Sequence, residues 1–79
     1  MGREEILEKV QEVLREELDN PSISVSAAST ASEVPGWDSL AHVQIVSAVE
    51  KAFGVRFTSR EIFRWNNVGE MVESISSRK

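Results

Sequence analysis

The chain has 79 residues, which is enough for one small domain with a thin core. It has no cysteine and a single histidine, so disulfide frameworks, thiol catalysis and cysteine- or histidine-rich metal sites are excluded. The formal net charge of −4 argues against nucleic acid as a partner, because binding nucleic acid needs a basic surface.

Contact with a membrane is not expected either. No stretch of the sequence approaches the roughly 18 consecutive apolar residues of a transmembrane helix, and no signal-peptide core is present. Hydrophobic residues make up 41% of the chain and charged residues 28%, which is ordinary for a folded protein. We therefore expect a globular protein of the cytoplasm.

The first predicted element is an amphipathic helix over residues 3–18. Its apolar residues recur at helical spacing, with Glu and Arg between them: Ile6, Leu7, Val10, Val13, Leu14 and Leu18. Asn20-Pro21 is expected to end the helix, because proline cannot continue the backbone hydrogen-bond ladder.

A long loop is predicted over residues 19–37. Ser, Ala, Thr and Pro dominate it, and only three apolar residues are expected to anchor it: Ile23, Val25 and Val34. Loops of this length are uncommon in compact domains and tend to be functional. The alternative is a plain surface crossover between two helices.

The second helix is expected from about Asp38 to Phe53. Its apolar residues are interpreted as one stripe, namely Leu40, Val43, Val46, Val49 and Phe53, widened by Ile45, Ala48 and Ala52. Gly54 supplies the left-handed residue that commonly closes a helix. The alternating run Val55-Arg56-Phe57 that follows is too short to form a sheet.

Two capping signals predict two more helices. Thr58-Ser59-Arg60-Glu61 is a capping box, so a short third helix is expected over Ser59–Arg64. Asn67 is expected to cap a fourth helix that turns four residues inward: Val68, Met71, Val72 and Ile75. The predicted fold is therefore all-α: a four-helix bundle with three major helices, one short third helix and a long loop between the first two.

Ser39 carries the main functional question, because it stands at the start of the second helix. Asp38 is a good N-cap, so we expect Ser39 at the first helical position with its hydroxyl outward. Three interpretations are open at this point. Ser39 is an ordinary helix-start residue; or it forms a Ser–His dyad with His42, although no Gly-x-Ser-x-Gly motif is present; or it carries a phosphate-linked group, which a helix N-terminus favours.

The stretch "GWDSLAHVQIVSAVEKAFGVRF" resembles the core of the acyl carrier protein family. The resemblance implies that Ser39 receives 4′-phosphopantetheine from coenzyme A. It implies that Asp38 helps the phosphopantetheinyl transferase to orient its metal ion and the serine. Leu40 and Val43 match positions that face the transferase and pathway enzymes, and we place His42 and Ile62 on the same contact surface.

The resemblance also implies a carrier without catalytic activity of its own. We expect residues 1–79 to form a single, freestanding, monomeric carrier domain of a specialised pathway. It would hold acyl groups as thioesters for fatty acid, polyketide or other specialised biosynthesis, with acyl-loading and acyl-accepting enzymes as partners. The alternatives are a peptidyl or aminoacyl carrier of a nonribosomal peptide pathway, and a helical interaction module that carries nothing.

Two features depart from the family pattern. Carriers of primary fatty acid synthesis usually bear a run of acids along the second helix, whereas this chain has Ala41, Gln44 and Lys51 and retains only Glu50. We therefore expect partners that are less basic than the fatty acid enzymes. Trp65 is interpreted either as an anchor of the short helix or as a filler of the space between helices. Our hypothesis is that the cargo is short, polar or only briefly held.

Overall fold

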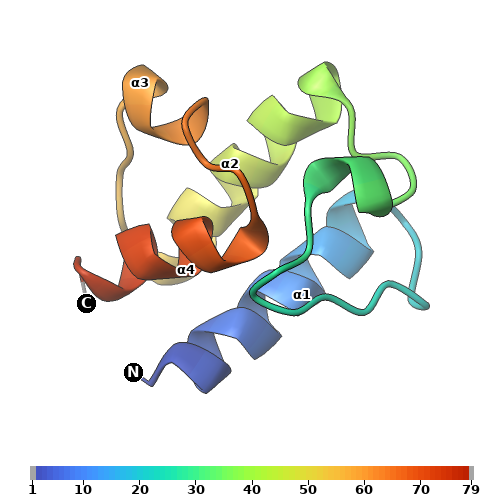
Figure 1. Ribbon diagram of the computed structural model, residues 1–79, viewed down its shortest axis with the longest axis horizontal. Coiled ribbons are helices and arrows are strands. Elements are labelled where there is room, and N and C mark those ends of the chain that lie inside the picture. The colour runs from blue at the N-terminus through green and yellow to red at the C-terminus, as the bar shows by residue number, and fades with distance from the viewer. Residues whose placement is uncertain (1, 79) are drawn as a thin grey trace.

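The computed structural model describes residues 2–78, which form four α-helices and one short 3₁₀ turn (Figure 1). Their bounds are α1 Arg3–Glu17, η1 Ala31–Glu33, α2 Ser39–Phe53, α3 Ser59–Ile62 and α4 Val68–Ser76. Residues 2–78 contain no strand. The predicted all-α fold, with three major helices and a short third one, is therefore confirmed.

The core lies where α1 packs against both α2 and α4. Most of its members are apolar residues of these three helices, joined by two residues of the long loop. They are Ile6, Val10, Val13, Leu14, Ile23, Val34, Ile45, Val49, Phe53, Val68, Met71, Val72 and Ile75. In Figure 1, α3 stands apart at the top left, so this short helix is free to shape the surface instead of the core.

The predicted caps are all present. Asp38 Oδ1 accepts from the Ala41 amide at 2.8 Å, and Asn67 Oδ1 accepts from the Glu70 amide at 2.9 Å. Thr58 Oγ1 accepts from the Glu61 amide at 3.1 Å, while the Glu61 carboxylate accepts from the Thr58 amide at 3.3 Å. Gly54 closes α2 in the left-handed region, with φ of 67°.

The end of α1 differs from the prediction. The helix ends at Glu17, and Asp19 takes a left-handed conformation with φ of 49°. The Asn20 amide donates to the Arg15 carbonyl at 2.9 Å, and the Asp19 amide donates to the Glu16 carbonyl at 3.3 Å. This pair of bonds is a Schellman motif. The helix is therefore closed before the proline, which only follows the stop.

The end of α3 also differs. The predicted helix reached Arg64, whereas α3 ends at Ile62. The Arg64 amide donates to the Glu61 carbonyl at 3.1 Å, a three-residue spacing that tightens the last turn. The chain then leaves the helix, which brings Phe63, Arg64 and Trp65 into the connection to α4.

The loop over residues 19–37 is held to the helices by polar contacts as well as by its apolar anchors. Arg15 Nε donates to the Ile23 carbonyl at 2.7 Å, and the Val25 amide donates to Gln11 Oε1 at 2.9 Å. Ile23 is buried and Val25 is half-buried. The loop also contains η1, a turn that the sequence analysis did not predict.

The same loop is attached to the start of α4. The Val68 amide donates to the Ser29 carbonyl, and the Gly69 amide donates to the Ala27 carbonyl, each at 2.8 Å. A Cβ at position 69 would lie 2.8 Å from the Ala27 oxygen, so this close approach requires glycine. The loop is thus fixed at its middle, on the way to Ser39.

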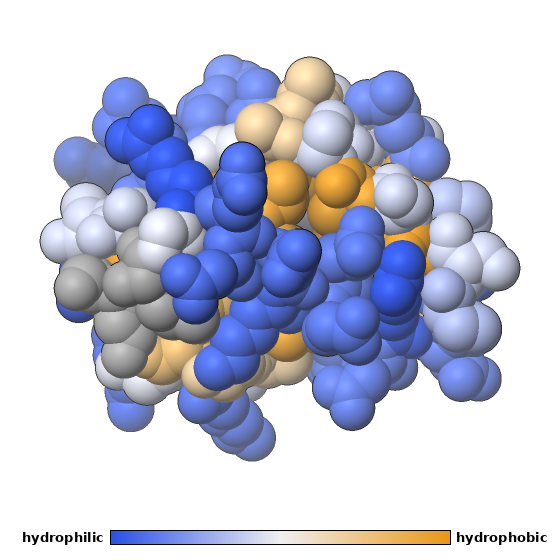
Figure 2. Space-filling model, turned by 90° about the horizontal axis from the view of Figure 1, so that it is seen from below, coloured by the Kyte–Doolittle hydropathy of each residue, from blue (hydrophilic) through white to orange (hydrophobic). Residues whose placement is uncertain are grey.

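The face seen from below is covered mainly by hydrophilic side chains (Figure 2). Within residues 2–78, no helix combines the length and the apolar character needed to cross a lipid bilayer.

Candidate functional site

Ser39 is the first residue of α2, and its side chain is exposed. Asp38 precedes it as the N-cap, so the predicted division of roles between a capping Asp38 and a first helical Ser39 is confirmed. The cap engages the Ala41 amide, and the Asp38 carbonyl accepts from the His42 amide at 2.8 Å. Within residues 2–78, no hydrogen bond engages the Ser39 hydroxyl, which lies at the surface.

The backbone around Ser39 suits a negatively charged substituent. Among residues 2–78, neither the Ser39 amide nor the Leu40 amide finds a hydrogen-bond acceptor. These unpaired N–H groups and the positive end of the α2 dipole favour an anion at this position. A phosphate ester on Ser39 Oγ therefore fits the chain, since the fold presents both the hydroxyl and the donors.

A groove of about 390 Å³ begins at Ser39 and runs between the start of α2 and the end of α3. We call it the Ser39 groove. Its larger walls are four ring side chains and one aliphatic side chain, and the small or polar Ala31, Ser32 and Asp38 complete it. The larger walls are Trp37, His42, Ile62, Phe63 and Trp65. Segments far apart in the sequence therefore meet beside one exposed hydroxyl.

His42 joins the two sides of the Ser39 groove. Trp37 Nε1–H donates to His42 Nδ1 at 3.0 Å, so the ring proton is on Nε2. This Nε2–H then donates to the Ile62 carbonyl at 2.9 Å. Both ring nitrogens are thereby engaged, and neither is available as a general base for Ser39. The Ser–His dyad has no support in this geometry.

Leu40 and Val43 are not part of the core, contrary to the predicted apolar stripe. Their exposed fractions are 73% and 52%. Each step of three residues turns the helix about 300°, since a residue covers about 100°. Leu40, Val43 and Val46 therefore move steadily around the helix instead of lining one face. The buried face of α2 consists of Ile45, Val46, Val49 and Phe53.

Phe63 is a site residue that the sequence analysis missed. It is 67% exposed, and its ring centroid lies 5.9 Å from that of His42. Its only signal in the sequence was its place directly after Ile62. Within residues 2–78, the large hydrophobic side chains that stand exposed are Leu40, Val43 and Phe63.

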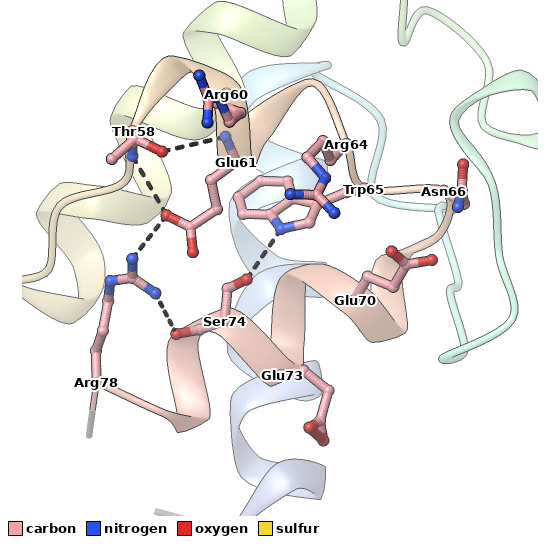
Figure 3. A pocket seen from close by; sticks show the side chains of 10 residues that line it. All are labelled: Thr58, Arg60, Glu61, Arg64, Trp65, Asn66, Glu70, Glu73, Ser74 and Arg78. Atoms are coloured by element: carbon pink, nitrogen blue, oxygen red, sulfur yellow. Dashed lines mark hydrogen bonds and ion pairs between the residues drawn. The ribbon is translucent and has the colours of Figure 1, made fainter.

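Trp65 anchors the connection between α3 and α4. Its Nε1–H donates to Ser74 Oγ at 3.0 Å, and its ring meets Phe57 edge-on, with centroids 5.0 Å apart. The indole lines a pocket of about 750 Å³ between α3 and α4. In Figure 3, Arg78 reaches across this pocket to Glu61 and the Ser74 carbonyl. The interpretation of Trp65 as an anchoring aromatic is confirmed.

Trp65 also limits the space inside the bundle. A cavity of about 60 Å³ lies between Trp37, His42, Trp65 and Met71. We call it the inner cavity. It has the volume of about two water molecules, each of which takes about 30 Å³ in the liquid. The second interpretation of Trp65, a filler of the interhelical space, therefore holds together with the first.

The acidic residue retained on α2 does not serve the exposed surface. The Glu50 carboxylate accepts from the Phe57 amide at 2.8 Å and is half-buried. The corresponding exposed positions carry Gln44 and Lys51. The exposed side chains of α2 are thus apolar, neutral or basic.

Comparison with known proteins gives concordant matches. The family model described as "Phosphopantetheine attachment site" matches residues 4–75. The acyl carrier protein of Saccharopolyspora erythraea is 34% identical over 73 residues, covering 92% of this chain and 77% of the relative. That of Prochlorococcus marinus is 34% identical over 79 residues, covering 100% of this chain and 99% of the relative.

A solved structure has the same fold. The solution NMR structure of a holo acyl carrier protein from Geobacter metallireducens superposes with a TM-score of 0.84. Its sequence is 24% identical, and the match covers 91% of this chain and 83% of that chain.

Proposed function

Because the chain belongs to the acyl carrier protein family, which carries covalently bound 4′-phosphopantetheine, we propose that Ser39 is the residue that holds this arm. One observation supports the assignment most directly. Ser39 is an exposed hydroxyl on the first turn of a capped helix, with unpaired amides beside it. The bound arm supplies a thiol that holds acyl groups as thioesters.

The residues around Ser39 prepare it for modification by a phosphopantetheinyl transferase. The Ser39 oxygen forms a bond to the pantetheine-linked phosphorus of coenzyme A, 3′,5′-ADP leaves with the bridging oxygen, and the serine proton passes to a base of the transferase. Asp38 holds the helix start and offers a second carboxylate oxygen toward the transferase's metal ion. The Ser39 and Leu40 amides face the charge of the new ester.

Partner enzymes are proposed to dock on the surface next to the arm. Leu40 and Val43 offer exposed apolar contacts from α2, and the half-buried Ile62 adds an apolar edge from α3. His42 contributes by holding the Ile62 carbonyl against α2 rather than by reaching out itself. Phe63 enlarges this surface.

The partners are proposed to be the transferase and the acyl-loading and acyl-accepting enzymes of a specialised pathway. With Glu50 turned toward the Phe57 amide, α2 lacks the acidic run that would attract strongly basic enzymes. We take residues 1–79 as one monomeric carrier domain that works in the cytoplasm and catalyses no reaction itself. A short or briefly held cargo is consistent with the small inner cavity.

Mass spectrometry tests the attachment directly. Incubation with coenzyme A and a broad-specificity transferase is expected to add the mass of one phosphopantetheine. Ser39→Ala is expected to abolish the gain, whereas Ser47→Ala, which removes another exposed serine of α2, should leave it intact. No gain under conditions that modify a control carrier would favour the non-carrying interaction module.

A further inference from the structure

We propose that the Ser39 groove is the resting place of the cargo and that it accepts an uncharged, planar aromatic acyl group. This inference rests on the attachment at Ser39 proposed above. It places the cargo outside the helical bundle, against ring side chains, instead of between the helices.

The first argument is continuity with the attachment point. Ser39 itself lines the groove, so an arm on its oxygen starts inside it. A flexible tether keeps its free end at a high effective concentration near the attachment point. The tethered group therefore samples the neighbouring surface repeatedly, and even a weak contact there becomes populated.

The second argument is that the inner cavity beside Trp37 and Trp65 is too small for a long acyl chain. The inner cavity holds about 60 Å³, far less than an alkyl chain of eight carbons needs. Widening it would move Trp37 or Trp65, whose indole N–H groups are bonded to His42 Nδ1 and Ser74 Oγ. Breaking these bonds would leave half-buried polar groups without partners, which is costly. The groove outside, at about 390 Å³, needs no such change.

The third argument is the chemistry of the walls. The indole N–H groups of Trp37 and Trp65 and both nitrogens of His42 are satisfied within the protein. Beside the polar Ser32 and Asp38 at its rim, the groove therefore offers mainly ring faces and edges, completed by the exposed Phe63. Such surfaces attract another ring in stacked or edge-to-face geometry.

The charges around the groove favour an uncharged acyl group. No Lys or Arg lies among its lining residues, so an acyl group with a free carboxylate finds no counter-ion there. The nearest charge in the lining is the Asp38 carboxylate. An uncharged ring therefore suits the groove better than a carboxylated acyl group or a long aliphatic chain.

The test uses the carrier charged with three different acyl groups. The transferase is supplied with phenylacetyl-, octanoyl- or acetyl-coenzyme A, and mass spectrometry verifies each product. The indole N–H signals of Trp37 and Trp65 are then compared in ¹H–¹⁵N spectra. Both signals, with the amides of Ile62 and Phe63, are expected to shift in the phenylacetyl form relative to the acetyl form.

The octanoyl form distinguishes the groove from the bundle interior. It is expected to match the acetyl form at core amides such as Val49, Met71 and Ile75. The inference is overturned if phenylacetyl and acetyl forms give the same indole signals, or if either larger group shifts the core amides instead.

Matched variants assign the effect to the groove. Phe63→Ala removes a wall that is 67% exposed and is expected to abolish most of the phenylacetyl shift, while Phe63→Tyr keeps the ring and should restore it. Leu40→Ala removes a side chain of similar exposure outside the groove and should leave the shift unchanged. Equal shifts in the Phe63→Ala and Leu40→Ala forms would contradict the proposal.

The two proposals fail in different ways. A chain that gains no mass at Ser39 refutes the attachment. A chain that gains the mass but shows no ring-dependent shift keeps the attachment and loses the aromatic resting place.

Discussion

Residues 30–44 and residues 45–53 are neighbours in the chain but are held by different forces. The first stretch contains one buried apolar residue, Val34, and is shaped by hydrogen bonds at Glu33, Asp38 and His42. The second is held by burial, with four apolar residues in the interior. The first stretch carries the site and the second carries much of the stability.

This difference shows how a small domain accommodates a functional surface. Local hydrogen bonds fix the backbone around Ser39 without covering it, so Leu40 and Val43 stay exposed. The core, in turn, takes only Val34 from the first stretch. Substitutions in the two stretches should therefore have separable effects on stability and on modification.

The largest effect on stability is expected in the packed stretch. Ile45→Ala removes a side chain that is 0% exposed and should lower the free energy of unfolding by about 2–5 kcal/mol. Leu40→Ala, at 73% exposure on the same helix, should change it by no more than about 0.5 kcal/mol. Urea unfolding followed by circular dichroism measures both. Similar losses would show that the two stretches are not held differently.

A smaller effect is expected at the cap. Asp38→Ala should cost about 1 kcal/mol, because the Ala41 amide loses its acceptor. Asp38→Asn keeps an equally good cap and should leave the unfolding midpoint nearly unchanged. If the carboxylate helps to orient the transferase's metal ion, as we propose, this variant should still be modified about 10- to 100-fold more slowly. An unchanged modification rate would show that Asp38 acts only as a helix cap.

The smallest effect is expected at η1, on the surface before α2. The Thr30 amide and the Thr30 hydroxyl both donate to the Glu33 carboxylate and lower the pKa of Glu33 from its ordinary value. The amide has the larger effect. A lowered pKa means that the charged form favours the folded turn. This contribution is present above the ordinary pKa and is lost as the pH falls through the lowered one.

An NMR titration of the Glu33 side-chain carbons measures this pKa. Thr30→Val removes the hydroxyl but keeps the amide donor, so the pKa should return only part of the way to its ordinary value. A complete return would mean that the hydroxyl, and not the backbone, provides the main interaction. The unfolding midpoint of the whole chain should hardly change, since Glu33 is exposed.

Much of the fold could be predicted from the sequence because its signals are local. The caps at Asp38, Thr58 and Asn67 depend on residues three positions apart, and Gly54 acts within one turn. The position of Ser39 followed from the same local logic. The spacing of apolar residues predicted one stripe that included Leu40 and Val43, but both are exposed. Residues spaced by three move around a helix, and composition does not show which face is covered.

The remaining features depend on contacts between distant segments. Nothing near His42 in the sequence indicates that Trp37 and the Ile62 carbonyl occupy its two nitrogens. The role of Phe63 depends on α3 ending two residues earlier than its capping box suggested. The inner cavity is likewise lined by Trp37 and Trp65, which lie far apart in the sequence.

The attachment of the long loop to α4 has a consequence for the order of events in the cell. The carbonyls of Ala27 and Ser29 accept hydrogen bonds from the amides of Gly69 and Val68. The ribosome adds these two residues after Ser39, so the bonds cannot form until α4 has begun. The approach to the serine therefore acquires its final shape only after the start of α4 has been made. A prematurely terminated product that lacks α4 would display the motif but not the surroundings that a modifying enzyme meets.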